Sequence, residues 1–237
     1  MQETPMVQLQ QVSKWYPGPS GNDGEATRVL SNIDLTIHGG QTLAVTGPSG
    51  SGKSTLLNII GALDRPSAGS VIFNGKNLSQ LSDRQLARFR NRYIGFVFQM
   101  HHLLPQCTTL ENVLVPTLAD DRHADKQEAD ERARQLLETV GLMDRMHYRP
   151  DQLSVGQCQR VAIVRALINQ PKLVLADEPT GALDHDAAGQ LTDLLLELNR
   201  QQHVTLLIVT HASQLAGRMG GVLELRNSTI HGVGVSR

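Results

Sequence analysis

The sequence is poor in aromatic residues and cysteine, has no long apolar run, and neither sign of charge predominates. Lys and Arg number 22 against 23 Asp and Glu, so the basic excess typical of a general nucleic-acid binder is missing. The two cysteines, Cys107 and Cys158, are too far apart for a disulfide framework or a cysteine zinc site. No apolar run approaches the roughly 18 residues that a membrane span needs, and the N-terminus lacks the features of a signal peptide. We therefore expect a cytoplasmic chain that binds no nucleic acid and does not insert into a membrane.

Short apolar runs alternate with longer helical patterns along the 237 residues, which indicates an α/β protein with a largely parallel sheet. No repeat and no long linker interrupts this pattern, so we expect one compact unit. The pattern predicts strands over residues 7–12, 30–37, 42–46, 94–98, 173–176 and 205–209. It predicts helices over residues 53–63, 123–140, 154–169 and 187–201, with a further short basic helix that begins at the Ser82 capping box.

A glycine-rich segment between the strand 42–46 and the helix 53–63 matches the pattern GxxxxGK[ST]. Its residues are Gly47, Pro48, Ser49, Gly50, Ser51, Gly52, Lys53 and Ser54. Glycines allow the backbone to wrap around a phosphate, and the N–H groups at a helix N-terminus attract anions. Lys53 adds a positive charge for the β- and γ-phosphates, and the Ser54 hydroxyl can ligate Mg²⁺. The segment therefore predicts a nucleotide phosphate loop.

Two acidic residues, Asp177 and Glu178, follow the apolar strand 173–176. In open α/β sheets ligands bind at the carboxyl ends of the strands. Alone, the pair would fit a solvated turn before Pro179 equally well. Together with the phosphate loop, it predicts that Asp177 holds the Mg²⁺ shell and that Glu178 polarises the water that attacks the γ-phosphate. The strand 205–209 leads to the same edge and favours His211 as a sensor or donor there.

The segment Leu153-Ser154-Val155-Gly156-Gln157 precedes an apolar helix. Taken by themselves, Ser154 and Gln157 form a helix capping box. Taken with the other motifs in their order, the segment makes the whole chain resemble the ATP-binding subunits of ABC transporters. That resemblance implies an α/β P-loop NTPase (RecA-like) core with a parallel sheet, an N-terminal antiparallel β part and an inserted α-helical subdomain. The subdomain would lie at about residues 100–165, inside a single ATPase domain over residues 1–237.

The resemblance also implies roles for individual residues. Tyr16 would stack on the adenine, Thr55 would close the phosphate loop that begins at Gly47, and Gln99 would touch Mg²⁺. Ser154, Gly156 and Gln157 would contact the ATP of an opposite subunit, with Asp184 in the adjoining D-loop. The catalytic residues would be Glu178, His211 and Lys53, and the ligands of Mg²⁺ would be Ser54, Gln99 and Asp177.

Three positions depart from the family pattern. Val155 replaces the first glycine of the signature segment 153–157, and Cys158 replaces a usually polar residue just after it. Ala212 replaces the Asp that typically follows the switch histidine, here His211. Since the phosphate-loop lysine, the two acids and His211 remain, these departures predict lower activity rather than its loss.

The resemblance further implies ATP and Mg²⁺, a head-to-tail homodimer and integral-membrane permease subunits at the cytoplasmic face of the inner membrane. The segments His101–Pro105 and Thr109–Val113 look like those of ATPases from lipoprotein-releasing (Lol) systems, relatives of macrolide-exporter and cell-division ATPases. The sequence therefore favours lipoprotein release from the inner membrane. Export of a macrolide, peptide or glycolipid, or a cell-division type of regulation without transport, remain open as alternatives. A soluble ATPase of DNA repair or translation, or a nucleotide kinase, fits the motifs less well.

Overall fold

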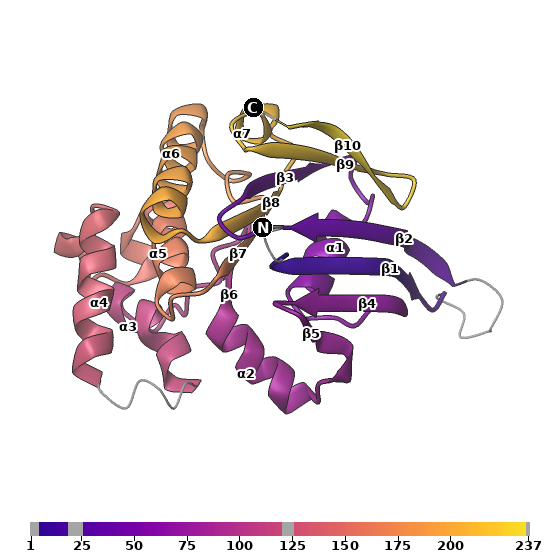
Figure 1. Cartoon of the computed structure of the whole chain (residues 1–237). Coiled ribbons are helices and arrows are strands. Elements are labelled where there is room, and N and C mark those ends of the chain that lie inside the picture. Colours follow the sequence, from indigo (N-terminus) through magenta and orange to yellow (C-terminus); the bar gives the residue numbers. More distant parts are fainter. Residues whose placement is uncertain (1–4, 19–25, 120–125, 236–237) are drawn as a thin grey trace. The chain divides into compact units, whose positions relative to one another are not determined.

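The computed structural model describes residues 5–18, 26–119 and 126–235. It contains two compact units, one formed by Met1–Leu86 with Leu207–Arg237 and the other by Ala87–Leu206. Figure 1 colours the chain by position, so that the first unit combines its indigo and yellow ends. None of the helices among these residues is long and apolar enough to cross a bilayer.

The first unit contains an antiparallel sheet of order β2-β1-β4-β5. Its strands are β1 (Val7–Tyr16), β2 (Thr27–Ile37), β4 (Ala68–Phe73) and β5 (Lys76–Asn77), and the short helix η1 (Leu78–Gln80) follows. The positive φ of Gln11 (50°) lies beside a shift in the β1–β2 register, which brings Val12 to the same buried side as Leu9. This sheet confirms the antiparallel part and the two strands that the sequence predicts for it.

A second set of strands in the first unit has parallel pairing. Strand β3 (Thr42–Thr46) runs parallel to β9 (Gly221–Arg226), which forms an antiparallel hairpin with β10 (Thr229–Val235). On the other side of β3 lies β8 (Thr205–Val209), whose first two residues belong to the second unit. The hydrogen bond from Thr210 N to Val45 O, 3.1 Å long, continues this contact.

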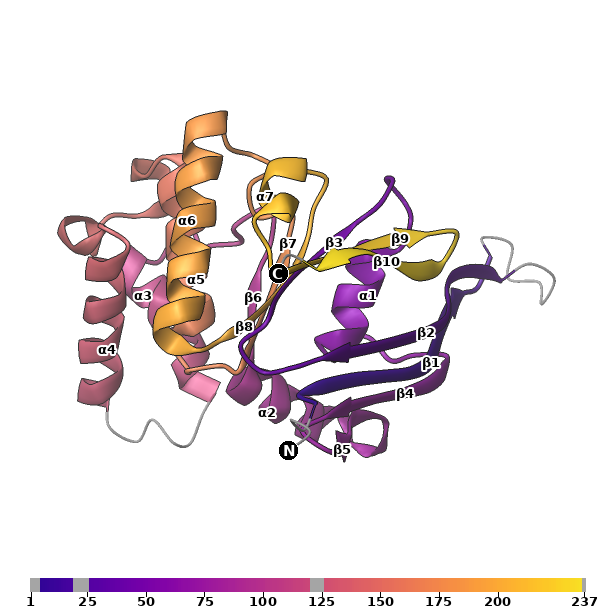
Figure 2. The same ribbon diagram turned by 45° about the horizontal axis from the view of Figure 1, so that its top comes forward.

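Two helices accompany these strands, α1 (Lys53–Ile60) and α7 (Ser213–Gly217). Helix α1 packs against β2, as Figure 2 shows. The sequence also predicts that this helix continues to residue 63 with Leu63 on its buried side, and both expectations are wrong. The helix ends at Ile60 with Gly61 as its C-cap, Ala62 takes a left-handed φ of 54°, and Leu63 is 48% exposed.

The second unit pairs strand β6 (Ile94–Val97) in parallel with β7 (Leu173–Asp177). Its helices are α3 (Thr109–Leu114), α4 (Lys126–Thr139), α5 (Val155–Leu167) and α6 (His185–Gln202), with α2 (Asp83–Tyr93) crossing the boundary from the first unit. The short helices η2 (Val115–Ala119), η3 (Met143–Arg145) and η4 (Pro150–Gln152) connect them. Helix α5 packs on β6, because Gly95 has no side chain: a Cβ there would lie 2.3 Å from Ala166 O.

The described residues between 100 and 165 form helices and loops without any strand. Helices α3, α4 and α5 pack on one another within this segment. The predicted helix over residues 123–140 corresponds to α4, and residues 123–125 lie outside the described part. The arrangement is that of the inserted helical region expected from the sequence.

Candidate functional site

The phosphate-loop segment has a backbone that only glycine adopts easily. Gly47, Gly50 and Gly52 have φ values of 149°, 75° and 101°. A Cβ on Gly47 would lie 2.3 Å from Leu225 O, and one on Gly52 would lie 2.8 Å from Val29 Cγ1. These close approaches hold the loop against β9 and β2. The crest, which contains Pro48, Ser49 and Gly50, is exposed.

Helix α1 begins at Lys53 directly after this loop. Its N-cap residue is Gly52, so no side chain caps the first turn. The N–H groups of that turn and the positive end of the helix dipole therefore favour an anion. Ser54 is exposed at the same place. The Ser51 Oγ atom is buried and has no hydrogen-bond partner among the described residues. This end of α1 fits a phosphate group.

Lys53 is 7% exposed and its side chain folds back over the loop. Lys53 Nζ donates hydrogen bonds to the carbonyl oxygens of Gly47 (2.9 Å) and Pro48 (3.0 Å). Lys53 Nζ also lies 3.2 Å from Nε2 of His211. The structure thus brings together two of the three residues predicted to be catalytic.

His211 follows β8 and is exposed. The next residue, Ala212, is the N-cap of α7 and has the extended backbone typical of that position, with φ −76° and ψ 103°. Ala212 N donates to Thr210 Oγ1 at 3.0 Å. Alanine offers no side-chain acceptor to the first turn of α7, so this departure from the family pattern removes a helix cap.

Tyr16 lies at the end of β1 and is 38% exposed. Its hydroxyl donates to Asp64 Oδ2 at 2.7 Å. Burial, and then the hydrogen bond to Asp64, raise the pKa of Tyr16 above its ordinary value. Burial alone would raise the pKa of Asp64, but the hydrogen bonds from Lys14, Tyr16 and the Arg65 N–H outweigh it and lower that pKa.

In the second unit, Asp177 ends β7 and Glu178 begins the following turn. Glu178 has a φ of 46°, in the left-handed region that is uncommon for any residue except glycine. The turn closes with a hydrogen bond of 3.0 Å from Gly181 N to Glu178 O, and Thr180 inside it is buried. A constrained backbone of this kind fixes the direction of the Glu178 side chain.

Gln99 lies against the same turn. A Cβ on Gly181 would be 3.0 Å from Gln99 Nε2, so the glycine makes room for the amide. The residue before it is anchored as well: Gln159, which is 2% exposed on α5, donates from Nε2 to Phe98 O at 2.9 Å. The second unit therefore brings Gln99 close to the turn that carries Glu178.

The segment after Gln99 is held by two side chains that the sequence analysis did not single out. Arg165 on α5 donates from Nη2 to His101 O and from Nη1 to His102 O, each at 2.7 Å. Burial lowers the pKa of Arg165. Asn112, fully buried on α3, accepts from Leu104 N at 2.7 Å. The sequence carries a signal for Arg165, which is a charged residue in a largely apolar helix. It carries none for Asn112, which shares its short helix with the polar residues Thr109 and Glu111.

Ser154 and Gln157 form the capping box that starts α5. Ser154 Oγ accepts from Gln157 N at 3.2 Å, and Gln157 Oε1 accepts from Ser154 N at 2.9 Å. The helix-capping interpretation is therefore confirmed. The Ser154 hydroxyl can still donate a hydrogen bond of its own, because it only accepts one in the capping box. Val155 beside it is 53% exposed, so a side chain larger than the glycine of the family pattern projects into solvent there.

A cavity of about 230 Å³ adjoins this segment. Its lining includes Ser154, Gly156, Gln157, Arg160, Leu183 and Gln190. Arg160 Nη2 donates to Gln190 Oε1 at 2.9 Å, which ties α5 to α6. Asp184 is the N-cap of α6 and accepts from Ala187 N at 2.8 Å. The predicted signature and D-loop residues are thus neighbours within the second unit.

The residues predicted to hold Mg²⁺ offer a hydroxyl, an amide and a carboxylate, from Ser54, Gln99 and Asp177. The described residues contain no group of three or more His, Cys, Asp or Glu side chains able to bind a metal. This donor set fits Mg²⁺, which prefers oxygen ligands and is usually held by one or two carboxylates together with substrate phosphates.

Comparisons with known proteins agree with these features. Residues 30–181 match the family model described as ABC transporter. "Lipoprotein-releasing system ATP-binding protein LolD" of Syntrophus aciditrophicus (strain SB) is 46% identical over 225 residues, covering 95% of this chain and 98% of that protein. The protein of the same name from Shewanella oneidensis is 48% identical over 223 residues, covering 94% of this chain and 94% of that protein.

Among solved structures, the dimeric structure of a post-hydrolysis state of the ATP-binding cassette MJ0796 bound to ADP and Pi is similar to this chain. The two share a TM-score of 0.87 and 38% identity, and the match covers 98% of this chain and 100% of that one. The likeness confirms the predicted P-loop NTPase fold, because it extends over nearly the whole chain. The chain belongs to the ABC transporter family, and it is an ATPase subunit of that family.

Proposed function

We propose that this ATPase subunit powers a separate membrane permease that releases lipoproteins from the inner membrane. The observation that carries the proposal is the similarity to two lipoprotein-releasing ATP-binding proteins, at 46% and 48% identity over nearly the full length of each chain. That similarity favours lipoprotein release over the export of a macrolide, peptide or glycolipid, and over a regulatory role without transport.

The phosphate loop would bind the β- and γ-phosphates of ATP. The uncapped first turn of α1 supplies N–H donors, and Lys53 supplies a positive charge that two loop carbonyls already orient. Tyr16 would stack on the adenine. His211, next to Lys53, would donate a hydrogen bond to the γ-phosphate as negative charge develops on it.

Glu178 would orient and polarise the attacking water. The left-handed backbone at Glu178 and the closed turn behind it support this role, because a general base must be held in hydrogen-bond reach of the proton it takes. Gln99 lies against that turn. Its position would depend on whether the γ-phosphate is present, and the chain segment after Gln99 would shift with it.

Mg²⁺, held by Ser54, Gln99, Asp177 and the phosphates, would neutralise the charge that develops during phosphoryl transfer. The chain's own contribution is to present these oxygen atoms. Ser54 does so from the exposed first turn of α1, and Asp177 from the end of a buried strand.

The second copy of the chain would complete each site. Ser154 retains an O–H donor after capping α5, and Gly156 leaves the adjoining surface open: the nearest atom to an added Cβ is Leu183 Cδ2, 3.8 Å away. Both features suit a surface that approaches a phosphate of the other subunit. The dimeric form of the similar ATP-binding cassette supports this arrangement. The permease would hold the dimer at the cytoplasmic face of the membrane.

The proposal is tested by depleting the chain in the organism that encodes it and fractionating its membranes. We expect lipoproteins destined for the outer membrane to accumulate in the inner membrane. Restoring the wild-type chain should return them, whereas the Lys53→Ala variant should not. Normal lipoprotein sorting after depletion would refute the proposed cargo, and the alternatives named above would then have to be tested with their own cargoes.

A further inference from the structure

Three side chains meet at the end of β1, outside the phosphate loop. Tyr16 Oη donates to Asp64 Oδ2 at 2.7 Å, and Lys14 Nζ donates to Asp64 Oδ1 at 2.7 Å. Lys14 Nζ also lies 4.7 Å from the centre of the Tyr16 ring. The aromatic ring is therefore fixed at its hydroxyl by an acid and covered on one face by a cation.

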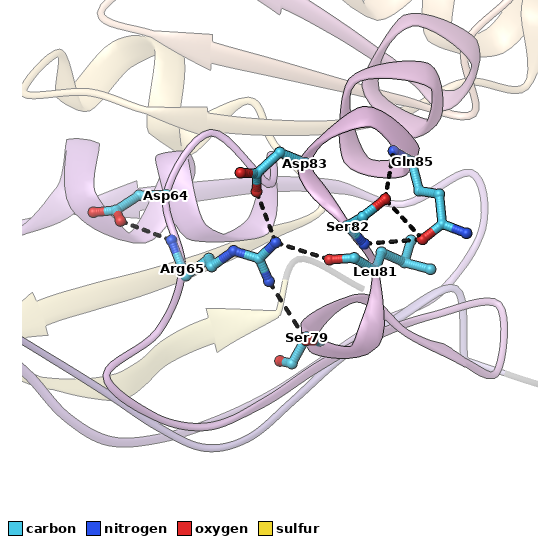
Figure 3. A network of polar contacts seen from close by, with 7 residues as sticks. All are labelled: Asp64, Arg65, Ser79, Leu81, Ser82, Asp83 and Gln85. Carbon is cyan, nitrogen blue, oxygen red and sulfur yellow. Dashed lines mark hydrogen bonds and ion pairs between the residues drawn. The ribbon is translucent and has the colours of Figure 1, made fainter.

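Asp64 is itself firmly placed. Its Oδ1 accepts from Arg65 N at 2.7 Å, and the carbonyl of Arg65 accepts from Lys14 Nζ at 2.9 Å. Figure 3 shows how the neighbouring Arg65 guanidinium is anchored at the start of α2. Arg65 Nη2 donates to Leu81 O and to Asp83 Oδ1, each at 2.8 Å. The carboxylate thus belongs to a fixed segment of chain rather than to a mobile surface residue.

We propose that Asp64 is a positioning residue for the nucleotide base. It holds the hydroxyl of Tyr16, while Lys14 covers one face of the ring, so that a base stacks on the other face. The inference rests on the role proposed above for Tyr16. A half-exposed tyrosine otherwise samples several rotamers, and a base that stacks on it must first order the ring. When the ring is already held in one rotamer, binding no longer includes the entropy cost of fixing it.

A merely structural ion pair between Lys14 and Asp64 would affect every ligand alike. A positioning role affects only ligands that carry a base. ADP and pyrophosphate separate the two, because both engage the phosphate loop and only ADP presents an adenine. Neither is hydrolysed by an ATPase, so calorimetric titration of the full chain with Mg²⁺ measures binding alone.

The variant Asp64→Ala should weaken ADP binding about three- to tenfold, the range expected for loss of an oriented aromatic contact, and leave pyrophosphate binding unchanged. Tyr16→Phe, which removes only the hydroxyl, should do the same. The double variant should bind ADP no more weakly than the weaker of the two single variants, because both changes break the hydrogen bond between Tyr16 and Asp64. Asp64→Asn keeps an oxygen acceptor for the hydroxyl and should retain most of the affinity. Asp83→Ala, which changes the same network on its exposed side, should bind ADP like wild type.

Tyr16→Ala separates the inference from the proposed function beneath it. If that variant binds ADP as well as wild type does, Tyr16 does not bind the base. The positioning role of Asp64 is then refuted together with the proposed role of Tyr16. If Tyr16→Ala weakens ADP binding but Asp64→Ala does not, only the positioning role is overturned. Equal weakening of ADP and pyrophosphate binding by Asp64→Ala, or additive effects of Asp64→Ala and Tyr16→Phe, would overturn it as well. The single tryptophan, Trp15, provides an independent fluorescence signal for each titration.

Discussion

The anchor between Gln159 and Phe98 offers a sharp test of how the segment around Gln99 is held. Gln159 is 2% exposed, and its amide donates to Phe98 O at 2.9 Å. Replacing it with leucine keeps a similar volume and leaves a carbonyl without its donor. An unsatisfied group of this kind costs about 1–3 kcal/mol, and the apolar leucine offsets part of that. We expect a net loss of roughly 1–2 kcal/mol, which corresponds to a fall in Tm of about 2–8 °C.

Two measurements check this expectation on Gln159→Leu. Thermal unfolding gives the stability change, and steady-state ATP turnover shows whether the looser segment disturbs Gln99. The control is Gln135→Leu, at an exposed position on α4, where a substitution should change stability by no more than about 0.5 kcal/mol. If the two variants have the same Tm and the same turnover, the hydrogen bond to Phe98 neither stabilises the fold nor holds Gln99 in place.

Three further predictions concern the loop, the switch region and pH. Gly52→Ala should abolish nucleotide binding in a titration, because φ at Gly52 is 101° and a Cβ would meet Val29 at 2.8 Å; near-normal affinity would show that the loop rearranges. Ala212→Asp should raise stability by about 0.5–1 kcal/mol in urea unfolding by capping α7, and an unchanged midpoint would contradict that role. Burial, and then the charges of Arg165 and His102, lower the pKa of His101. The unfolded chain therefore binds more protons near pH 6, so stability should fall as the pH drops below about 6.5, and His101→Gln should lessen that fall.

The motifs that depend on local sequence could be predicted well. Strands β3 and β8 have the predicted bounds, since each is a short apolar run between turn residues. The capping boxes at Ser82 and Ser154 form as expected. The phosphate loop could be identified because its glycines, lysine and hydroxyl follow one another in a fixed order.

Elements that depend on distant partners could not be predicted. Strand β4 was not expected, because Gly69 weakens its pattern; the structure explains the glycine, since a Cβ there would lie 2.4 Å from Gln11 O on β1. The hairpin β9–β10 gains its order by pairing with β3, far away in sequence. The side chains that hold the site follow the same rule: Tyr16 and Asp64 are 48 residues apart, and Gln159 and Phe98 are 61 apart. No short window of sequence contains both partners.

We propose that ATP hydrolysis at Glu178 drives lipoprotein release, and an assay that follows both processes at once tests this role. The complex of this subunit with its permease is purified from membranes, and phosphate production is recorded together with lipoprotein release. With Glu178→Gln, we predict that ATP still binds while turnover and release both cease, because the amide cannot take the proton of the attacking water. Unaltered turnover in that variant would show that Glu178 is not the catalytic base.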